Sequence, residues 1–225
     1  MEHIAYIRNG FSSKFGIPRQ SGIVQSLKSD VIFYQQFRNS FALRGLENFS
    51  HIWLIWEFSA SARSDGKWSP TVRPPRLGGN ERVGVFATRS PFRPNPIGLS
   101  CVKLDDIDFE TPEGPVLHIS GADMMDGTPV FDIKPYIPFT DCRPEASAGF
   151  TELTLKHRLE VVVPDGIAHT VPSDVLCDIR GLLAGDPRPG YQHDPERVYA
   201  FEYSGYGVRF TVVDKVLQVV SIDRI

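Results

Sequence analysis

Two arginines and an asparagine stand in a proline-rich stretch of the chain. Arg89, Arg93 and Asn95 are each followed within two residues by a proline in the sequence Arg-Ser-Pro-Phe-Arg-Pro-Asn-Pro, residues 89–96. Each proline fixes its own φ angle and pushes the preceding residue toward an extended conformation, which predicts a stiff loop. Guanidinium and amide groups on a rigid backbone suit the binding of an anionic or heteroaromatic ligand. A rigid surface turn with solvated arginines is the alternative, because proline and asparagine are ordinary turn residues.

The same stretch ends a basic segment. Residues 61–95 hold seven basic and two acidic side chains, a local charge of +5 in a chain of net charge −3. The overall charge argues against general attraction to nucleic acid, whereas a local basic patch can still bind phosphate groups. The candidate phosphate-binding side chains are Arg63, Lys67, Arg73 and Arg76. A solvated basic face is the alternative interpretation.

Several common kinds of site are absent from the sequence. There is no G-x-G-x-x-G after a predicted strand, no Walker A loop and no G-x-S-x-G elbow. The six histidines show no metal-ligand spacing, so no metal is expected, and three widely spaced cysteines are typical of a reduced, cytoplasmic protein. The first residues lack the apolar core of a signal peptide, and the apolar run at 52–56 is too short to cross a membrane.

Strands should position these side chains. Apolar and aromatic patterns predict strands over residues 3–8, 31–37, 50–58, 83–87, 99–107, 116–120 and 130–133. The strand at 50–58 is apolar on both faces and is expected to be central, and the strand at 83–87 is expected to be buried. Residues 59–80 should form a long loop, and loops of this length are commonly functional.

The C-terminal part should be a smaller domain. Proline, alanine, serine and glycine gather at 143–149 and indicate a boundary. A helix is expected over 173–183, with Ser173 as its N-cap and Gly185 at its end, beside strands at 157–163, 198–203, 207–213 and 216–222. Arg188 lies between two prolines in a second rigid loop. The expected fold class is mainly β (α+β), with one domain over 1–142 and a small α+β domain over 150–225.

Seven segments, in order, resemble one protein family. They are Phe-Gly-Ile-Pro-Arg-Gln (15–20), Gly-Leu-Glu-Asn-Phe-Ser-His (45–51), Pro-Thr-Val-Arg-Pro-Pro-Arg-Leu-Gly-Gly (70–79), Val-Gly-Val-Phe-Ala-Thr-Arg-Ser (83–90), Phe-Arg-Pro-Asn-Pro-Ile-Gly (92–98), Asp-Gly-Thr-Pro (126–129) and Asp-Ile-Lys-Pro-Tyr (132–136). Over residues 3–142 this order resembles the TrmO (TsaA-like) tRNA methyltransferases, and residues 186–191 resemble a motif of that family's smaller C-terminal domain. The resemblance implies a small single-sheet β-barrel and a homodimer.

The resemblance also implies an activity and a cofactor. Members transfer a methyl group from S-adenosyl-L-methionine to N6 of the threonylcarbamoyl-adenosine at position 37 of tRNA. The family's cofactor positions correspond to Pro18, Arg19, Gln20, Ser59, Ala60, Arg89, Leu99, Asp126, Gly127, Thr128 and Pro129. Ser59-Ala60 stands where many members have His-Gln, so a backbone contact would survive there and a histidine side-chain role would not.

The implied chemistry assigns roles to a few polar side chains. Arg19 or Arg89 would bind the methionine carboxylate, and nearby carbonyl groups or Asp126 would stabilise the sulfonium cation. The methyl group must be held in line with N6, whose proton must leave, and Lys134 and Tyr136 are the candidate catalytic residues near that proton. An ion pair between Asp132 and Lys134 is the structural alternative.

The implied partner is tRNA. The candidate tRNA-binding residues are Arg63, Lys67, Arg73, Arg76, Arg93, Asn95 and Arg188. The C-terminal domain is expected to help in handling tRNA and not to be needed for the cofactor pocket; a plain capping domain, with Arg188 at its surface, is the alternative. Two other functions are open: a non-catalytic S-adenosylmethionine-binding regulator, and a methyltransferase on another small acceptor, which would not need the basic 61–95 segment.

Overall fold

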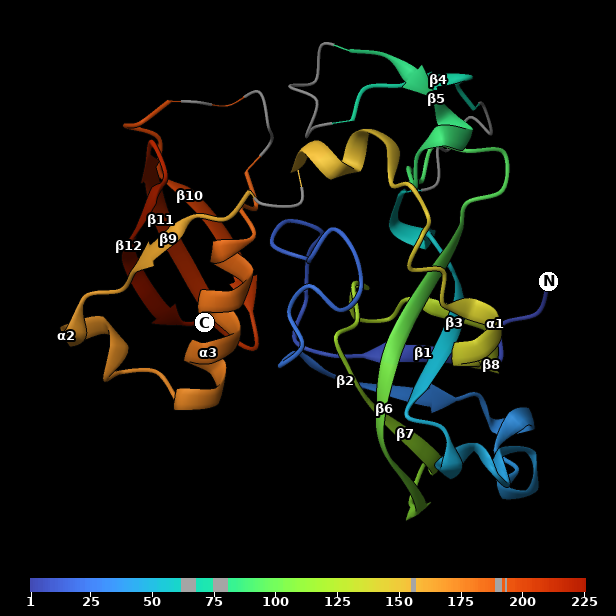
Figure 1. Ribbon diagram of the computed structural model, residues 1–225. Coiled ribbons are helices and arrows are strands. Elements are labelled where there is room, and N and C mark those ends of the chain that lie inside the picture. The colour runs from blue at the N-terminus through green and yellow to red at the C-terminus, as the bar shows by residue number, and fades with distance from the viewer. Residues whose placement is uncertain (62–67, 75–80, 155–156, 189–191, 193) are drawn as a thin grey trace.

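Six antiparallel strands close into a barrel in the order β1-β2-β7-β6-β3-β8 (Figure 1). The computed structural model describes residues 1–61, 68–74, 81–154, 157–188, 192 and 194–225. The barrel strands are β1 (Ala5–Arg8), β2 (Lys28–Phe33), β3 (His51–Glu57), β6 (Ile97–Thr111), β7 (Gly114–Ser120) and β8 (Pro129–Pro135). The single-sheet barrel and the mainly β class are therefore confirmed.

The strand β3 is central, as its sequence indicates. It pairs with β6 on one side and with β8 on the other. Ile52, Leu54 and Trp56 alternate along it and point into the barrel, where each is at most 6% exposed. The Trp56 ring lies against Gly98 of β6, so closely that a Cβ atom at Gly98 would stand 2.2 Å from the ring. Glycine at this position therefore lets the indole fill one end of the barrel.

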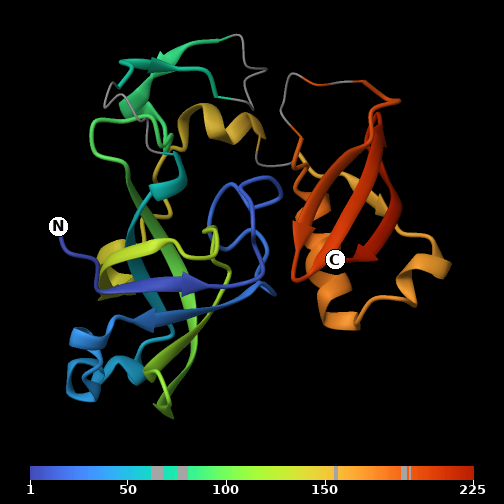
Figure 2. The same ribbon diagram turned by 180° about the vertical axis from the view of Figure 1, so that it is seen from behind.

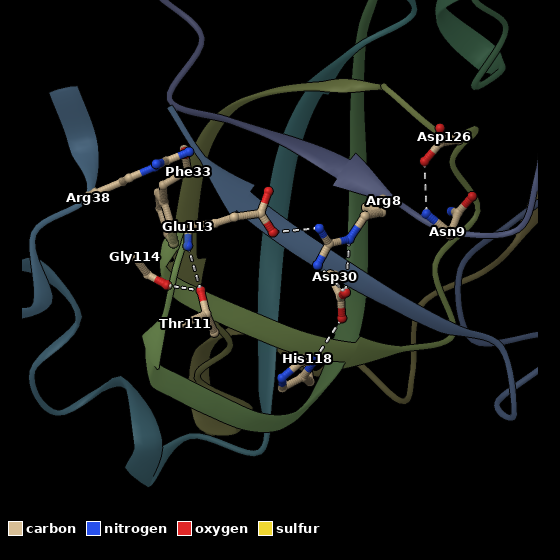
Figure 3. Close-up of polar contacts among 10 residues, drawn as sticks. All are labelled: Arg8, Asn9, Asp30, Phe33, Arg38, Thr111, Glu113, Gly114, His118 and Asp126. Carbon is tan, nitrogen blue, oxygen red and sulfur yellow. Dashed lines mark hydrogen bonds and ion pairs between the residues drawn. The ribbon is translucent and has the colours of Figure 1, made fainter. Parts of the chain in front are cut away.

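A cluster of charged side chains links three neighbouring strands on the outside of the barrel (Figure 3). Arg8 donates to Glu113 at 2.6 Å and to Asp30 at 3.0 Å, and His118 Nδ1 lies 2.7 Å from the other Asp30 oxygen. The hydrogen bonds that Arg8 donates to Glu113 and then to Asp30 raise the pKa of Arg8. Because these side chains are partly exposed to solvent, their contribution to stability is small, and we assign them to strand alignment.

The C-terminal domain has a second sheet of order β10-β11-β12-β9 (Figure 2). Its strands are β9 (Glu160–Val162), β10 (Tyr199–Tyr203), β11 (Tyr206–Val213) and β12 (Val216–Arg224), and β9 runs parallel to β12. Helices α2 (Asp165–Ala168) and α3 (Ser173–Ala184) accompany it. The predicted helix and its end at Gly185 are confirmed, but Pro172 is the N-cap residue and Ser173 makes no capping bond.

The core of this second domain includes residues from the opposite end of the chain. Phe11, Val24 and Leu27 pack with the buried side chains of α3 and the C-terminal sheet. They belong to the segment between β1 and β2, residues 9–27, which we call the N-terminal loop. In both views this blue segment lies between the barrel and the C-terminal domain (Figures 1 and 2). The loop therefore joins the two domains.

Some expected elements differ in the structure. Residues 83–87 are not a buried strand: only β5 (Val83–Gly84) is extended, pairing with β4 (Thr71–Val72), and a 3₁₀ turn follows at Val85–Ala87. Phe86 in that turn is 70% exposed, because this two-stranded arm lies outside the barrel and only Val85 is buried. The strand expected at 31–37 ends at Phe33 and is followed by a 3₁₀ turn at Gln35–Phe37.

Short helical segments occupy several connections. They are the 3₁₀ turns Ser40–Leu43, Leu46–Asn48, Ser59–Ser61 and Gly149–Thr154 and the helix α1 (Pro138–Asp141). In the described ranges, no helix is long and apolar enough to span a membrane. Within those same ranges, no three His, Cys, Asp or Glu side chains gather into a group that could hold a metal ion.

Candidate functional site

A cavity of about 950 Å³ opens at one end of the barrel. Its floor is formed by the end of β3 and the start of β6, including Trp56 and Gly98. One wall is the N-terminal loop, and the facing wall is the segment of residues 88–96, which we call the proline loop. Such a concave site with apolar walls and a few polar groups is typical of a binding site for a small molecule.

Most of the predicted cofactor residues line this one cavity. Those at its surface are Pro18, Arg19, Gln20, Ser59, Ala60, Arg89, Leu99 and Thr128. Arg93 and Asn95 of the proline loop line it as well. Residues from four separate segments of the sequence thus line a single cavity. This convergence favours a binding site over the alternative of a rigid surface turn with solvated arginines.

The N-terminal loop is held in place by the C-terminal domain. Arg19 donates from Nη2 to the backbone carbonyl oxygens of Arg188, at 2.7 Å, and of Asp186, at 3.3 Å. A Cβ atom on Gly16, whose φ is +100°, would lie 2.6 Å from the Phe201 ring of β10. The backbone N–H of Ser204 also donates to the carbonyl of Gly10 at 2.9 Å. The predicted cofactor residues of this loop are therefore positioned by the C-terminal domain.

Asp186 is itself fixed by two basic side chains. Arg188 donates from Nε to Oδ1 at 2.9 Å and from Nη2 to Oδ2 at 3.0 Å, and His157 Nε2 lies 2.9 Å from Oδ2. Burial works against ionisation of Asp186, but the hydrogen bonds from Arg188 and His157 outweigh it and lower the pKa. The carboxylate holds the turn in which Asp186 has a φ of 51°.

The proline loop is held mainly by bonds within itself. Arg93 donates from Nη1 to the Thr88 carbonyl oxygen at 2.9 Å, and Thr88 Oγ1 donates to the Val85 carbonyl oxygen at 2.8 Å. The Arg93 guanidinium also lies 6.0 Å from the centre of the Phe86 ring, at cation–π distance. Arg89 reaches across the cavity, where its Nη1 donates to Gln20 Oε1 at 2.5 Å. Gln20 and Arg89 therefore link the two walls.

The turn at 126–129 lies beside the cavity and is tied to the end of β1. Asp126 Oδ1 accepts a hydrogen bond at 3.0 Å from the backbone N–H of Asn9, as Figure 3 shows. Gly127, with a φ of +74°, donates its backbone N–H to the carbonyl of Ile7 at 2.8 Å. Thr128 is the member of this turn whose atoms reach the cavity surface. The Asp126 carboxylate thus holds the backbone, and Gly127 supplies the left-handed conformation that the turn requires.

The comparison with known proteins places the chain in a family. The N-terminal domain of tRNA-methyltransferase O matches residues 6–142, and the TrmO C-terminal domain matches residues 168–225. The chain belongs to the TrmO family. It is 40% identical to the tRNA (adenine(37)-N6)-methyltransferase of Escherichia coli over 99% of this chain and 97% of the relative. A relative of the same name from Eikenella corrodens is 49% identical over 73% of this chain and 92% of its own.

A solved structure agrees with the TrmO assignment. The crystal structure of TrmO from Pseudomonas aeruginosa superposes with a TM-score of 0.75 at 31% sequence identity, covering 98% of this chain and 96% of that one. The similarity extends over the barrel and the C-terminal domain together. The chain therefore folds as a barrel and not as a Rossmann sheet, in keeping with the absence of a Rossmann glycine fingerprint from its sequence.

The predicted catalytic pair lies away from the cavity. Lys134 and Tyr136 are not at the cavity surface. Lys134 pairs in the sheet with Trp53 and donates to Asp132 at 2.9 Å, the ion pair considered as the structural alternative. Tyr136 packs against Trp53 with ring centres 5.7 Å apart, at the end of β3 opposite to Trp56. The structure does not bring these two residues to the cavity of their own chain, and their catalytic role stays a prediction.

The predicted tRNA-binding residues that the structure describes lie in different parts of the molecule. Arg63, Lys67 and Arg76 lie outside the described residues, whereas Arg73 follows β4 on the two-stranded arm. Arg188 is 8% exposed, and its guanidinium is paired with Asp186. It is therefore neither a solvated surface residue nor displayed for tRNA in this conformation, and its contact with tRNA stays a prediction. Arg93 and Asn95 line the cavity, and their contact with tRNA likewise stays a prediction.

Several cavity residues were missed by the motif comparison. They are Lys14, Trp56, Glu57, Phe58, Asp123, Met124 and Met125. Asp123 is the most informative, because it is an ionisable side chain that is mostly buried at the cavity wall. Its only sequence signal is that it stands three residues before the Asp126–Pro129 motif. That spacing says nothing about which way its side chain points.

Proposed function

We propose that this protein methylates N6 of adenosine 37 in tRNA with S-adenosyl-L-methionine as the methyl donor. The observation that carries the proposal is the convergence of the family's cofactor positions on one cavity of about 950 Å³. The family membership and the names of the relatives from Escherichia coli and Eikenella corrodens support the same reaction.

The cavity has the groups that this methyl donor requires. Arg89 and Arg19 are guanidinium groups suited to the carboxylate of the methionine part. Phe58, Leu99 and the methionines form apolar walls for a heteroaromatic ring. When bound, S-adenosylmethionine supplies an electrophilic methyl group, so the residues of the chain need only bind, orient and remove a proton.

The finer identity of the substrate is also a proposal. We propose that the adenosine carries an N6-threonylcarbamoyl group, as the TrmO resemblance implies. The threonyl carboxylate of this group would suit the guanidinium of Arg93, which lines the cavity on the side of the proline loop. Comparing methylation of tRNA with and without the threonylcarbamoyl group tests this point. Equal rates on the two substrates would contradict it.

A homodimer in the cytoplasm is proposed on the same resemblance. Because Lys134 and Tyr136 lie outside the cavity of their own chain, a direct chemical role for them requires that they approach the cavity of a second copy. Mixing a Lys134→Ala, Tyr136→Phe variant with a cofactor-site variant tests this, since activity should return only in mixed dimers. Sedimentation analysis gives the oligomeric state independently.

The deciding experiment is mass analysis of position 37 in tRNA incubated with the protein and S-adenosylmethionine. We expect a mass gain of one methyl group at that nucleoside. A non-catalytic regulator would bind S-adenosylmethionine in calorimetry and leave the tRNA unchanged. A methyltransferase for another small acceptor would consume the donor only when that acceptor is added.

The proposed tRNA surface has its own test. Replacing Arg63, Lys67, Arg73 and Arg76 together by Ala should lower tRNA affinity and flatten its salt dependence, because each phosphate contact releases counterions. Affinity for S-adenosylmethionine should be unchanged. An unaltered salt slope would mean that the basic segment is only a solvated face.

A further inference from the structure

Asp123 occupies a position that none of the motifs explains. It follows β7, lies at the wall of the cavity and is mostly buried. The described lining contains one other carboxylate, Glu57, whose Oε2 lies 2.7 Å from Nε2 of His3. Asp123 instead has a hydroxyl group as its closest side-chain partner. Among the carboxylates of the described lining, it is therefore the one without a basic side chain in direct contact.

A directional chain of hydrogen bonds fixes this carboxylate. The indole N–H of Trp56 donates to Ser100 Oγ at 2.9 Å, and Ser100 Oγ donates to Asp123 Oδ1 at 2.5 Å. Indole nitrogen can only donate, so the single hydroxyl hydrogen of Ser100 is left for Asp123. Ser100 is 1% exposed and has no freedom to exchange this bond with water. Asp123 therefore accepts this hydrogen bond as an ionised carboxylate. The ionised carboxylate is the form that can take up a proton.

The surroundings make Asp123 a stronger base than an ordinary aspartate. Burial raises its pKa, and the hydrogen bonds from Ser100 and from the backbone N–H groups of Asp123 and Ser21 oppose this rise, as does the positive charge of Arg89. A base whose pKa is closer to the working pH is more effective in proton transfer. The remaining charged side chains of the described lining are Lys14, Arg19, Glu57 and Arg93.

We propose that Asp123 is the catalytic residue that accepts the proton of N6 during methyl transfer, an inference that rests on the proposed function. The nitrogen lone pair forms the new N–C bond, the electrons of the C–S bond stay on sulfur, and the N6 proton passes to the Asp123 carboxylate. The products are the methylated nucleoside, the uncharged thioether and a neutral Asp123. Ser100 is the positioning residue, since it acts through Asp123.

The first test is Asp123→Asn, which keeps the size of the side chain and an oxygen acceptor for Ser100. We expect the single-turnover methylation rate to fall about 10²- to 10⁴-fold, the range for loss of a general base. Calorimetric affinities for S-adenosylmethionine and for its demethylated product should change less than about threefold. Asp106→Asn, an exposed substitution on β6, is the matched control and should methylate at the wild-type rate.

The second test does not depend on turnover. The pKa of Asp123, followed by NMR of its labelled carboxyl carbon in the free protein, should rise in Ser100→Ala because that variant loses a hydrogen bond to the carboxylate. The rising limb of the pH–rate profile should move to higher pH in the same variant and should disappear in Asp123→Asn. If Ser100 had a purely structural role, its replacement would shift neither the pKa of Asp123 nor the pH–rate profile.

The other outcomes overturn the proposal. If Asp123→Asn lowers affinity for S-adenosylmethionine but not for the uncharged product, Asp123 is a counter-ion for the sulfonium. If it methylates at the wild-type rate, or if it loses both ligands equally, Asp123 is not the proton acceptor. Failure of the wild-type protein to methylate tRNA is a separate result, which contradicts the proposed function itself.

Discussion

The two walls of the cavity are built in different ways. The proline loop is held by short-range bonds, such as that from Arg93 to Thr88, and by the conformational restriction of its own prolines. The N-terminal loop has few bonds of that kind. Its side chains pack into the core of the C-terminal domain, and Arg19 donates to carbonyl oxygens of that domain. One wall is therefore rigid by local sequence, and the other is rigid by contact with a distant domain.

This difference gives the C-terminal domain a structural role at the cavity. We expected from the sequence that it would handle tRNA and would not be needed for the cofactor pocket. The second part of that expectation is at odds with the structure, because Phe11, Val24 and Leu27 are buried by the C-terminal domain. The domain supports one wall of the cavity, whatever it also contributes to tRNA binding. Substitutions in the two walls should accordingly reduce cofactor affinity to different extents.

The largest effect is expected on removing the C-terminal domain. A chain ending at residue 148 should keep the barrel, whose buried core is a separate cluster, and lose affinity for S-adenosylmethionine by more than about a hundredfold. The N-terminal loop would lose the partners of Phe11, Val24 and Leu27. Calorimetry measures the affinity, and circular dichroism checks the barrel. Tight binding by a folded barrel would show that the N-terminal loop supports itself.

The next effect concerns Arg89, which links the two walls. Arg89→Ala should weaken S-adenosylmethionine binding by about 1.5–3 kcal/mol, the range for hydrogen bonds to charged groups. The fold should be unaffected, as thermal unfolding would show. Arg82→Ala is the control, because Arg82 is exposed and bonds to Thr71 outside the cavity. An unchanged calorimetric affinity for S-adenosylmethionine in Arg89→Ala would show that Arg89 does not bind the cofactor.

A single methyl group in the N-terminal loop should have an intermediate effect. In Gly16→Ala the new Cβ atom meets the Phe201 ring at a backbone φ of +100°, and the left-handed conformation alone costs about 1–2 kcal/mol. We expect cofactor affinity to fall about tenfold in calorimetric titrations. Gly22→Ala is the control for backbone strain, since its φ is +76° and nothing lies within 4 Å of the added atom. Equal effects of the two variants would mean that the contact with Phe201 is unimportant.

Acid should weaken the N-terminal wall through Asp186. The folded pKa of this carboxyl is lowered, so its stabilisation is complete above the unfolded value of about 3.9 and is lost as the pH falls through the folded pKa. Asp186→Asn should lower the free energy of unfolding at pH 7 by about 1–3 kcal/mol and make it less dependent on pH below about 4. Chemical denaturation across this pH range provides the measurement. If the stability of Asp186→Asn falls with acid as steeply as that of the wild type, Asp186 is not the cause of the acid sensitivity.

The smallest effect is expected in the proline loop. Pro94→Ala should reduce cofactor affinity only about two- to fivefold, because the main loss is about 0.4–1 kcal/mol of conformational restriction and the bonds of Arg93 remain. Calorimetry on this variant beside Gly16→Ala compares the two walls directly. A larger loss of cofactor affinity in Pro94→Ala than in Gly16→Ala would mean that the proline loop is the more easily disturbed wall.

The sequence was informative where local patterns decide the structure. The continuous apolar and aromatic run of β3 and the helical spacing of apolar residues in α3 predicted those elements, because both patterns are set by residues close together in the sequence. The pattern at 83–87 misled, since short apolar runs do not show whether a strand has neighbours on both sides. Phe86 in that run is exposed on the two-stranded arm.

The site was predictable to the extent that its residues lie in long motifs. Arg19, Gln20 and Arg89 came from the family resemblance, and they do share a cavity. Asp123 was not predicted, because a single aspartate outside a motif carries no spacing signal. The burial of Phe11 by a domain at the other end of the chain was also out of reach, because no local pattern encodes a contact of that sequence separation.

The placement of Phe11, Val24 and Leu27 has a consequence for biosynthesis. All six barrel strands end by Pro135, so the barrel can close on the ribosome while the C-terminal half is still being made. The N-terminal loop must wait, although it is translated among the first segments, because its apolar side chains find their partners only when β10, β11 and β12 have emerged. A nascent or prematurely terminated chain would thus hold a folded barrel with one cavity wall unfinished. With the proposed cofactor site in this cavity, donor binding would begin only after synthesis of the last strand.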